Sequence, residues 1–112
     1  GAMNEIYREI CEKLDWSVTS DGDGNIELEK YSPAGEDFII TVGEERFVDN
    51  VKAYAASFDQ EEHIEMWVAA RRSGTSGVPS AKELVEDAQA IDDMLRELSC
   101  ALFAAELEAV GA

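Results

Sequence analysis

The chain is poor in the residues that build metal and redox sites. Its 112 residues include two cysteines and one histidine. Cys11 and Cys100 are far apart and each lies beside apolar residues, so we expect buried, reduced thiols rather than a disulfide or a zinc site. A metal site needs several convergent ligands, so a lone histidine predicts that His63 lies on a solvated helix surface. No bound metal or cofactor is expected.

Motifs for catalysis are also missing. The segment GTSG at 74–77 contains glycines and hydroxyls, but a phosphate-binding loop needs a longer Gly-to-Gly-Lys spacing after a strand. This segment instead joins two expected helices and is followed by Val-Pro. Neither thiol has a candidate base partner, because His63 stands among glutamates. In a chain with 25 acidic residues, a pair of carboxylates says nothing about acid-base catalysis. We therefore expect a protein that is not an enzyme.

Long apolar runs are absent as well. No run approaches the ~18 to 20 residues that a membrane span needs. The start NEIYREICEKLD is amphipathic and acidic, unlike a secretion signal or a transit peptide. Gly1-Ala2 before Met3 has the form of a remnant left by removal of an expression tag. The sequence thus predicts a cytoplasmic protein without membrane contact, whose native numbering begins at Met3.

Basic residues are scarce compared with acidic ones. The 9 lysines and arginines face 25 acidic residues, and the formal net charge is −16. Scattered cations cannot offset the repulsion between phosphates and this charge, so direct nucleic-acid binding is not expected. Because self-repulsion on this scale opposes compaction, the acidity predicts a role other than stability. The 46% of hydrophobic residues still suffices for a folded core, and the length favours a single domain over 1–112.

The hydrophobic periodicity changes twice along the chain. Apolar residues recur at helical spacing in 3–15, after Asn4 as a capping residue. From 16 to 43 they alternate with polar residues in three short runs, separated by SDGDGN and SPAGED, which predicts an antiparallel meander. Residues 44–110 return to helical spacing, with capping boxes at Asp59 and Ser80. The expected fold is α+β: an N-terminal helix, a three-stranded antiparallel sheet, then three helices ending in a long C-terminal helix.

The first turn of this meander resembles the start of a calcium loop. Asp21, Asp23 and Asn25 match the first, third and fifth positions of an EF-hand. The sixth position, which requires glycine, is Ile26, and the twelfth, which requires glutamate, is Ser32. A hairpin turn is therefore favoured over a calcium site.

The last predicted helix carries a heptad pattern. From Leu84 its apolar positions alternate steps of four and three residues, as in a coiled coil. A helix from Ser80 to Val110 would be roughly 45 Å long, more than the width of such a domain. It would overhang the body, bend near Ser99, or be covered by a second chain. In the last case the protein is a homodimer with a seam formed by Ile91, Leu95, Leu98 and Leu102.

Acidic residues are spread over every predicted element rather than gathered in a tail, so the charges are fixed on a folded surface. Carboxylates at i and i+4 of a helix are separated by ~6 Å of rise, comparable to phosphate spacing along a nucleic-acid strand. A cleft made for DNA could accept such a surface, with Trp67, Phe47 or Tyr31 as apolar anchors at its rim. The predicted partner-binding residues are Glu44, Glu45, Asp49, Asp59, Glu61, Glu62 and Glu65.

Two stretches carry a resemblance to known proteins. EHIEMWVAARRSGTSGVPSAKELVEDAQAIDDML and LEKYSPAGEDFIITV are similar to small acidic proteins encoded on phages and other mobile elements of gut bacteria. The resemblance covers most of the chain and contains no catalytic motif. It implies a mobile-element accessory protein in the bacterial cytosol, of the kind that blocks host defence by occupying the DNA-binding surface of a nuclease, as acidic anti-restriction and anti-CRISPR proteins do.

Three functional hypotheses follow from the sequence. The leading one is a non-enzymatic DNA mimic that binds a basic, nucleic-acid-handling protein. The alternative is a homo-oligomeric assembly module that uses the heptad helix, with the acid serving solubility and partner selection. The third is an enzyme or a metal-dependent sensor that uses Asp21, Asp23 and Asn25.

Overall fold

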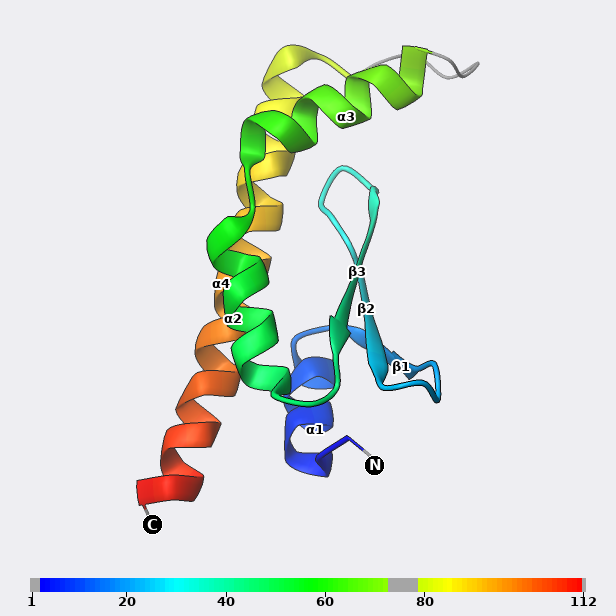
Figure 1. Ribbon diagram of the computed structural model, residues 1–112. Coiled ribbons are helices and arrows are strands. Elements are labelled where there is room, and N and C mark those ends of the chain that lie inside the picture. Colours follow the sequence, from blue (N-terminus) through cyan, green and yellow to red (C-terminus); the bar gives the residue numbers. More distant parts are fainter. Residues whose placement is uncertain (1–2, 73–78, 112) are drawn as a thin grey trace.

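The computed structural model describes residues 3–72 and 79–111 and has the α+β fold that the sequence predicts (Figure 1). The GTSG segment lies outside the described residues. The elements are α1 (Glu5–Lys13), β1 (Ser17–Ser20), β2 (Asn25–Tyr31), β3 (Asp37–Gly43), α2 (Phe47–Ser57), α3 (Gln60–Arg72) and α4 (Ala81–Gly111).

The start of helix α1 is capped by a side chain of the preceding residue. The Asn4 Oδ1 accepts a hydrogen bond of 2.8 Å from the backbone N–H of Ile6, which caps the first turn. After the helix the chain reverses through Asp15, whose φ is +67°, and places Trp16 in the core.

The two cysteines differ in burial. Cys11 faces the same core and is fully buried. Burial raises the pKa of its thiol to about 11, so Cys11 stays protonated at neutral pH. Cys100 is exposed, which corrects the prediction that both thiols are buried.

The sheet is the expected meander with strand order β1-β2-β3. Both pairs are antiparallel, with Val18 opposite Leu28 and Leu28 opposite Ile40. The alternation places one set of side chains against the helices and the other in solvent, as a half-buried sheet requires. The buried set on β2 and β3 is Ile26, Leu28, Phe38, Ile40 and Val42.

The Asp21-Gly-Asp-Gly-Asn stretch forms the predicted hairpin turn. Asp21 Oδ1 accepts hydrogen bonds from the backbone N–H groups of Asp23 at 2.7 Å and Asn25 at 3.1 Å. Its Oδ2 accepts one from Asn25 Nδ2 at 2.9 Å. The side chain of Asn25 is the main cause that lowers the pKa of the Asp21 carboxyl. Gly22 and Gly24 supply φ values of +79° and +89°, which a hairpin turn needs and side chains disfavour. The Asp21 carboxylate is thus used to close the turn.

Two short helices join the sheet to the long helix α4. Helix α2 lies along α4 and also contacts β3, while α1 contacts both α4 and β1 (Figure 1). Helix α3 crosses the N-terminal part of α4. Helix α4 is continuous over its 31 residues, and its C-terminal end extends beyond the rest of the molecule (Figure 1). Of the alternatives for this helix, overhang is the one observed, without a break near Ser99.

The residues predicted as a dimer seam belong to the core of a single chain. Ile91, Leu95, Leu98 and Leu102 each have 0% exposed surface and pack with residues of the sheet, α1 and α2. The prediction of a seam at these positions is therefore wrong. A heptad pattern describes any helix that buries one narrow face, whether the covering surface comes from a second chain or from the same one.

Two of the three predicted rim aromatics are also core residues. Trp67 is 8% exposed and Phe47 is 5% exposed, whereas Tyr31 is 64% exposed. Phe47 stacks on Tyr7 with ring centroids 6.4 Å apart. Of the three, only Tyr31 has the exposure that an anchor at the rim of an interface requires.

Candidate functional site

Four of the predicted partner-binding carboxylates gather where α2 meets α3. Asp59, Glu61, Glu62 and Glu65 are all exposed. The local sequence explains the arrangement, because Asp59 Oδ1 accepts a 3.1 Å hydrogen bond from the Glu62 backbone N–H and thereby caps α3. Acidic side chains in the first turn are also favoured by the helix dipole. We call these four residues the α3 acidic patch.

The other three predicted carboxylates lie at the opposite end of α2, so the seven predicted residues form two separate groups rather than one surface patch. Glu44 and Glu45 precede α2 and Asp49 is in its first turn. The 11-residue helix between the two groups corresponds to about 16 Å of rise. Asp49 is paired with Arg46 at 3.1 Å, which partly offsets the negative charge at this end.

The fold instead brings the β2–β3 turn against α3. His63 Nε2 lies 2.9 Å from Glu36 Oε2, and the His63 and Glu36 side chains are only 16% and 20% exposed. Because a carboxylate only accepts, the imidazole Nε2 donates in this contact. The prediction that His63 is solvated is therefore wrong. Sequence reasoning had no signal for this pair, since 27 positions separate its members.

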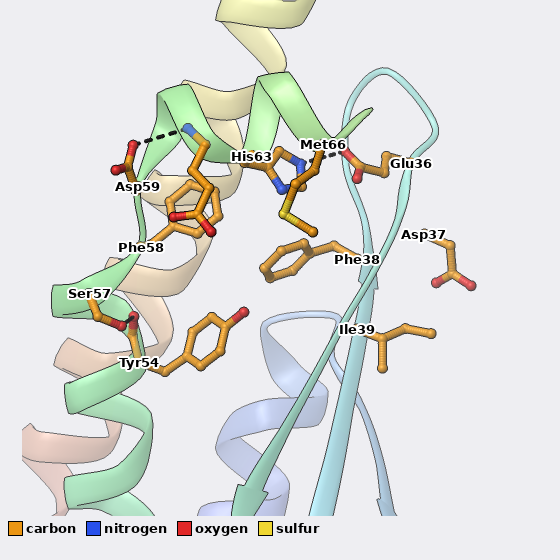
Figure 2. A pocket seen from close by; sticks show the side chains of 11 residues that line it. Glu36, Asp37, Phe38, Ile39, Tyr54, Ser57, Phe58, Asp59, His63 and Met66 are labelled. Atoms are coloured by element: carbon orange, nitrogen blue, oxygen red, sulfur yellow. Dashed lines mark hydrogen bonds and ion pairs between the residues drawn. The ribbon is translucent and has the colours of Figure 1, made fainter. Parts of the chain in front are cut away.

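A pocket of about 410 Å³ opens between β3 and the junction of α2 and α3. Three rings form one of its walls. Phe38 and Phe58 meet edge to face at 5.9 Å between centroids, and the His63 ring lies 5.8 Å from Phe38 and 5.4 Å from Phe58. Tyr54 of α2 points toward this cluster, and Met66 of α3 lies beside Phe38 (Figure 2). Asp59 and Glu62 of the α3 acidic patch also line the pocket.

Two acidic residues of α4, Asp87 and Asp92, are buried, although the sequence predicts acidic side chains on the surface. Asp87 is 3% exposed and accepts hydrogen bonds at 2.9 Å from Ser32 Oγ and from the Ala34 backbone N–H. It thereby ties the β2–β3 turn to α4. Asp92 is 8% exposed and accepts from Gln60 Nε2 at 2.7 Å and Arg96 Nε at 2.9 Å. The bond from Gln60 is the main cause that lowers the pKa of Asp92. Both carboxylates are structural.

The outer face of the sheet carries acidic residues next to one another. Glu27 and Glu29 lie on β2 on either side of the buried Leu28, and Asp37 is the first residue of the neighbouring β3. A hydrogen bond with the Asp37 carboxyl is the first cause that raises the pKa of Glu29, with its charge adding to the effect. A neighbouring carboxylate that raises the pKa of Glu29 opposes folding at neutral pH, because it disfavours the charged form of Glu29.

We expect Glu29→Gln to raise the thermal midpoint at pH 7. A group whose pKa is raised by folding favours the folded state below its unfolded pKa, and this contribution is lost as the pH rises through the folded pKa. The substitution should therefore raise the thermal midpoint at pH 7 and leave it unchanged near pH 3. Calorimetry at both pH values measures it, with Glu9→Gln on α1 as a matched control. An equal gain in both variants would show that only net charge matters.

Membrane and metal sites have little support in the described part of the chain. None of its helices combines the length and the apolar character that a bilayer-crossing segment requires. Residues 3–72 and 79–111 also contain no group of three or more His, Cys, Asp or Glu side chains arranged to hold a metal ion.

Comparisons of the chain with protein-family models, with curated proteins and with solved structures find no match. We therefore infer a function from the geometry and the charge of the site.

Proposed function

We propose that this protein is a non-enzymatic acidic binding protein whose α3 acidic patch engages a basic surface of a nucleic-acid-handling protein. The observation that carries the proposal is a net charge of −16 on a folded domain, with Glu61, Glu62 and Glu65 exposed together on one short helix. The ion pairs formed by the described side chains leave these three carboxylates without a basic partner. Their charge is available to another molecule.

The carboxylate arrangement supports mimicry of a nucleic-acid backbone. Glu61 and Glu65 are one helical turn apart, at ~6 Å of rise. Rigid elements present these charges without the entropy cost of ordering a flexible acidic tail. Electrostatic steering would speed the encounter with a DNA-binding cleft and would weaken as salt rises.

The biological setting of this proposal is inhibition of a host defence nuclease in the bacterial cytosol. The resemblance to small acidic proteins of phages and mobile elements supports this setting. Occupation of the DNA-binding surface would inhibit such a target without any chemistry by the inhibitor.

Affinity capture tests the proposal. The tagged protein is incubated with nuclease-treated bacterial lysate, eluted with a salt gradient and the eluate analysed by mass spectrometry. The expected result is a basic nucleic-acid-binding protein released by salt. Capture of only non-basic proteins would contradict the proposal.

Self-association is the second candidate function, and the overhang of α4 favours it. Phe103, Leu107 and Val110 are 38%, 55% and 82% exposed, and Ile6 of α1 is 59% exposed nearby. Exposed apolar side chains grouped in this way are typical of interfaces between chains. Light scattering decides between the alternatives: a dimer that Leu107→Glu converts to a monomer supports an assembly module, and a monomeric wild type excludes it.

A further inference from the structure

We propose that the pocket between β3 and the α2–α3 junction receives an arginine side chain of the partner. This inference deepens the proposed function, because it names the group that anchors a basic partner beside the α3 acidic patch. The pocket combines three features that one cation can use together: a concave space, aromatic surfaces and carboxylates.

The space suits one extended side chain. The volume of about 410 Å³ lies at the lower end of the ~300 to 1,000 Å³ typical of small-ligand sites. The pocket is open to solvent on the side of Met66, which is 63% exposed. A partner's side chain can therefore enter from the surface while the partner backbone stays outside. The flexible thioether of Met66 can adapt to the occupant.

The walls provide aromatic surface for a cation, chiefly on the half-buried Tyr54 and Phe58, since Phe38 behind them is only 6% exposed. Phe58 and Tyr54 come from α2 and its end, and Phe38 comes from β3, so two separate elements hold the rings (Figure 2). The ring contacts between Phe38, Phe58 and His63 fix the wall before any ligand binds. A guanidinium group stacks on such faces and is more weakly hydrated than an ammonium group, so arginine is favoured over lysine.

The carboxylates at the pocket supply charge complementarity. Asp59 and Glu62 line it from the α3 side, and both are exposed at its edge. Glu36 Oε2 is bonded to His63, so Glu36 fixes the imidazole and adds negative potential. Asp37 and Ile39 border the pocket but point to the other face of β3 (Figure 2). We therefore assign the contact with the guanidinium to Glu62, with Asp59 contributing charge while it caps α3.

The experiment uses small probes on the intact protein. N-acetyl-arginine amide is titrated into the ¹⁵N,¹³C-labelled protein at constant ionic strength and followed by NMR. The expected result is saturable shifts centred on Tyr54, Phe58, His63 and Met66. N-acetyl-citrulline amide, which is neutral and nearly isosteric, should cause no such shifts. The matched lysine amide should bind more weakly.

Two neighbouring substitutions separate the pocket from general charge. Glu62→Gln should weaken arginine amide binding about three- to fivefold, the effect of losing one solvent-exposed ion pair. Glu61→Gln removes the same charge from the same turn of α3 but does not line the pocket, so its effect should be much smaller. Equal effects of the two variants, equal binding of the citrulline amide, or shifts spread over the whole acidic surface would overturn the inference. The titration needs no partner, so its outcome is independent of the capture experiment.

Discussion

Replacement of Asp87 by alanine is expected to destabilise the protein by about 2 to 4 kcal/mol, because buried donors lose a charged acceptor. Ser32 Oγ and the Ala34 backbone N–H both donate to this carboxylate, and Ser32 is only 5% exposed. The loss is a large part of the ~5 to 15 kcal/mol that holds a domain folded. Chemical denaturation with circular dichroism measures the free energy of unfolding.

Asp93→Ala is the matched control for this prediction. Asp93 is an exposed residue on the same helix, so its removal makes the net charge less negative by the same amount but breaks no buried hydrogen bond. We expect the free energy of unfolding of this variant to stay within about 0.5 kcal/mol of the wild type. If the two variants unfold alike, the hydrogen bonds of Asp87 do not secure the β2–β3 turn to α4.

Reversal of the α3 carboxylates should abolish most partner binding. The triple variant Glu61→Lys, Glu62→Lys and Glu65→Lys changes the net charge from −16 to −10, since each reversal adds two. Loss of three attractive contacts and gain of three repulsive ones should weaken affinity for the captured protein on the order of 100-fold or more. Isothermal titration calorimetry at fixed salt measures the change. Circular dichroism must show an intact fold, because lysines near the start of α3 oppose the helix dipole.

A second triple variant with the same net charge tests whether the location matters. Glu9, Glu97 and Glu108 are exposed on α1 and α4, away from α3, and their reversal to lysine also gives −10. This control should retain binding within about tenfold, with the loss mainly in the association rate. Equal weakening in both triple variants would remove the α3 acidic patch from consideration and leave only bulk charge.

The fold could be predicted from the sequence because its elements are encoded locally. Alternating residues around Ile26 and Leu28 produced a half-buried strand, and the capping side chains of Asn4, Asp59 and Ser80 bond the helix starts as expected. The hydrogen bonds that close the turn at Asp21 also connect residues close in sequence. In each case the interactions that decide the structure connect residues close in sequence.

The site could be predicted only in part, because its geometry depends on long-range contacts. The four residues of the α3 acidic patch lie close together in sequence, so the sequence alone could group them, while their role in partner binding stays a prediction. Glu36 and His63 are 27 positions apart in the sequence, and Asp87 and Ser32 are 55 positions apart. No local sequence pattern predicts either contact. The apolar spacing at Leu95 and Leu98 predicted a buried face correctly but could not identify the covering surface, which is the chain's own core. Composition likewise could not distinguish surface carboxylates from the buried Asp87 and Asp92.

Competition with DNA tests the central claim most directly. The captured protein is bound to a fluorescent DNA duplex, and the wild-type protein is added at constant ionic strength while fluorescence anisotropy is followed. Mimicry predicts full displacement of the duplex, with an inhibition constant equal to the directly measured dissociation constant, and no displacement by the α3 triple variant at the same concentration. A ternary complex, in which the target holds the duplex and this protein together, would contradict the claim that the acidic surface occupies a nucleic-acid site.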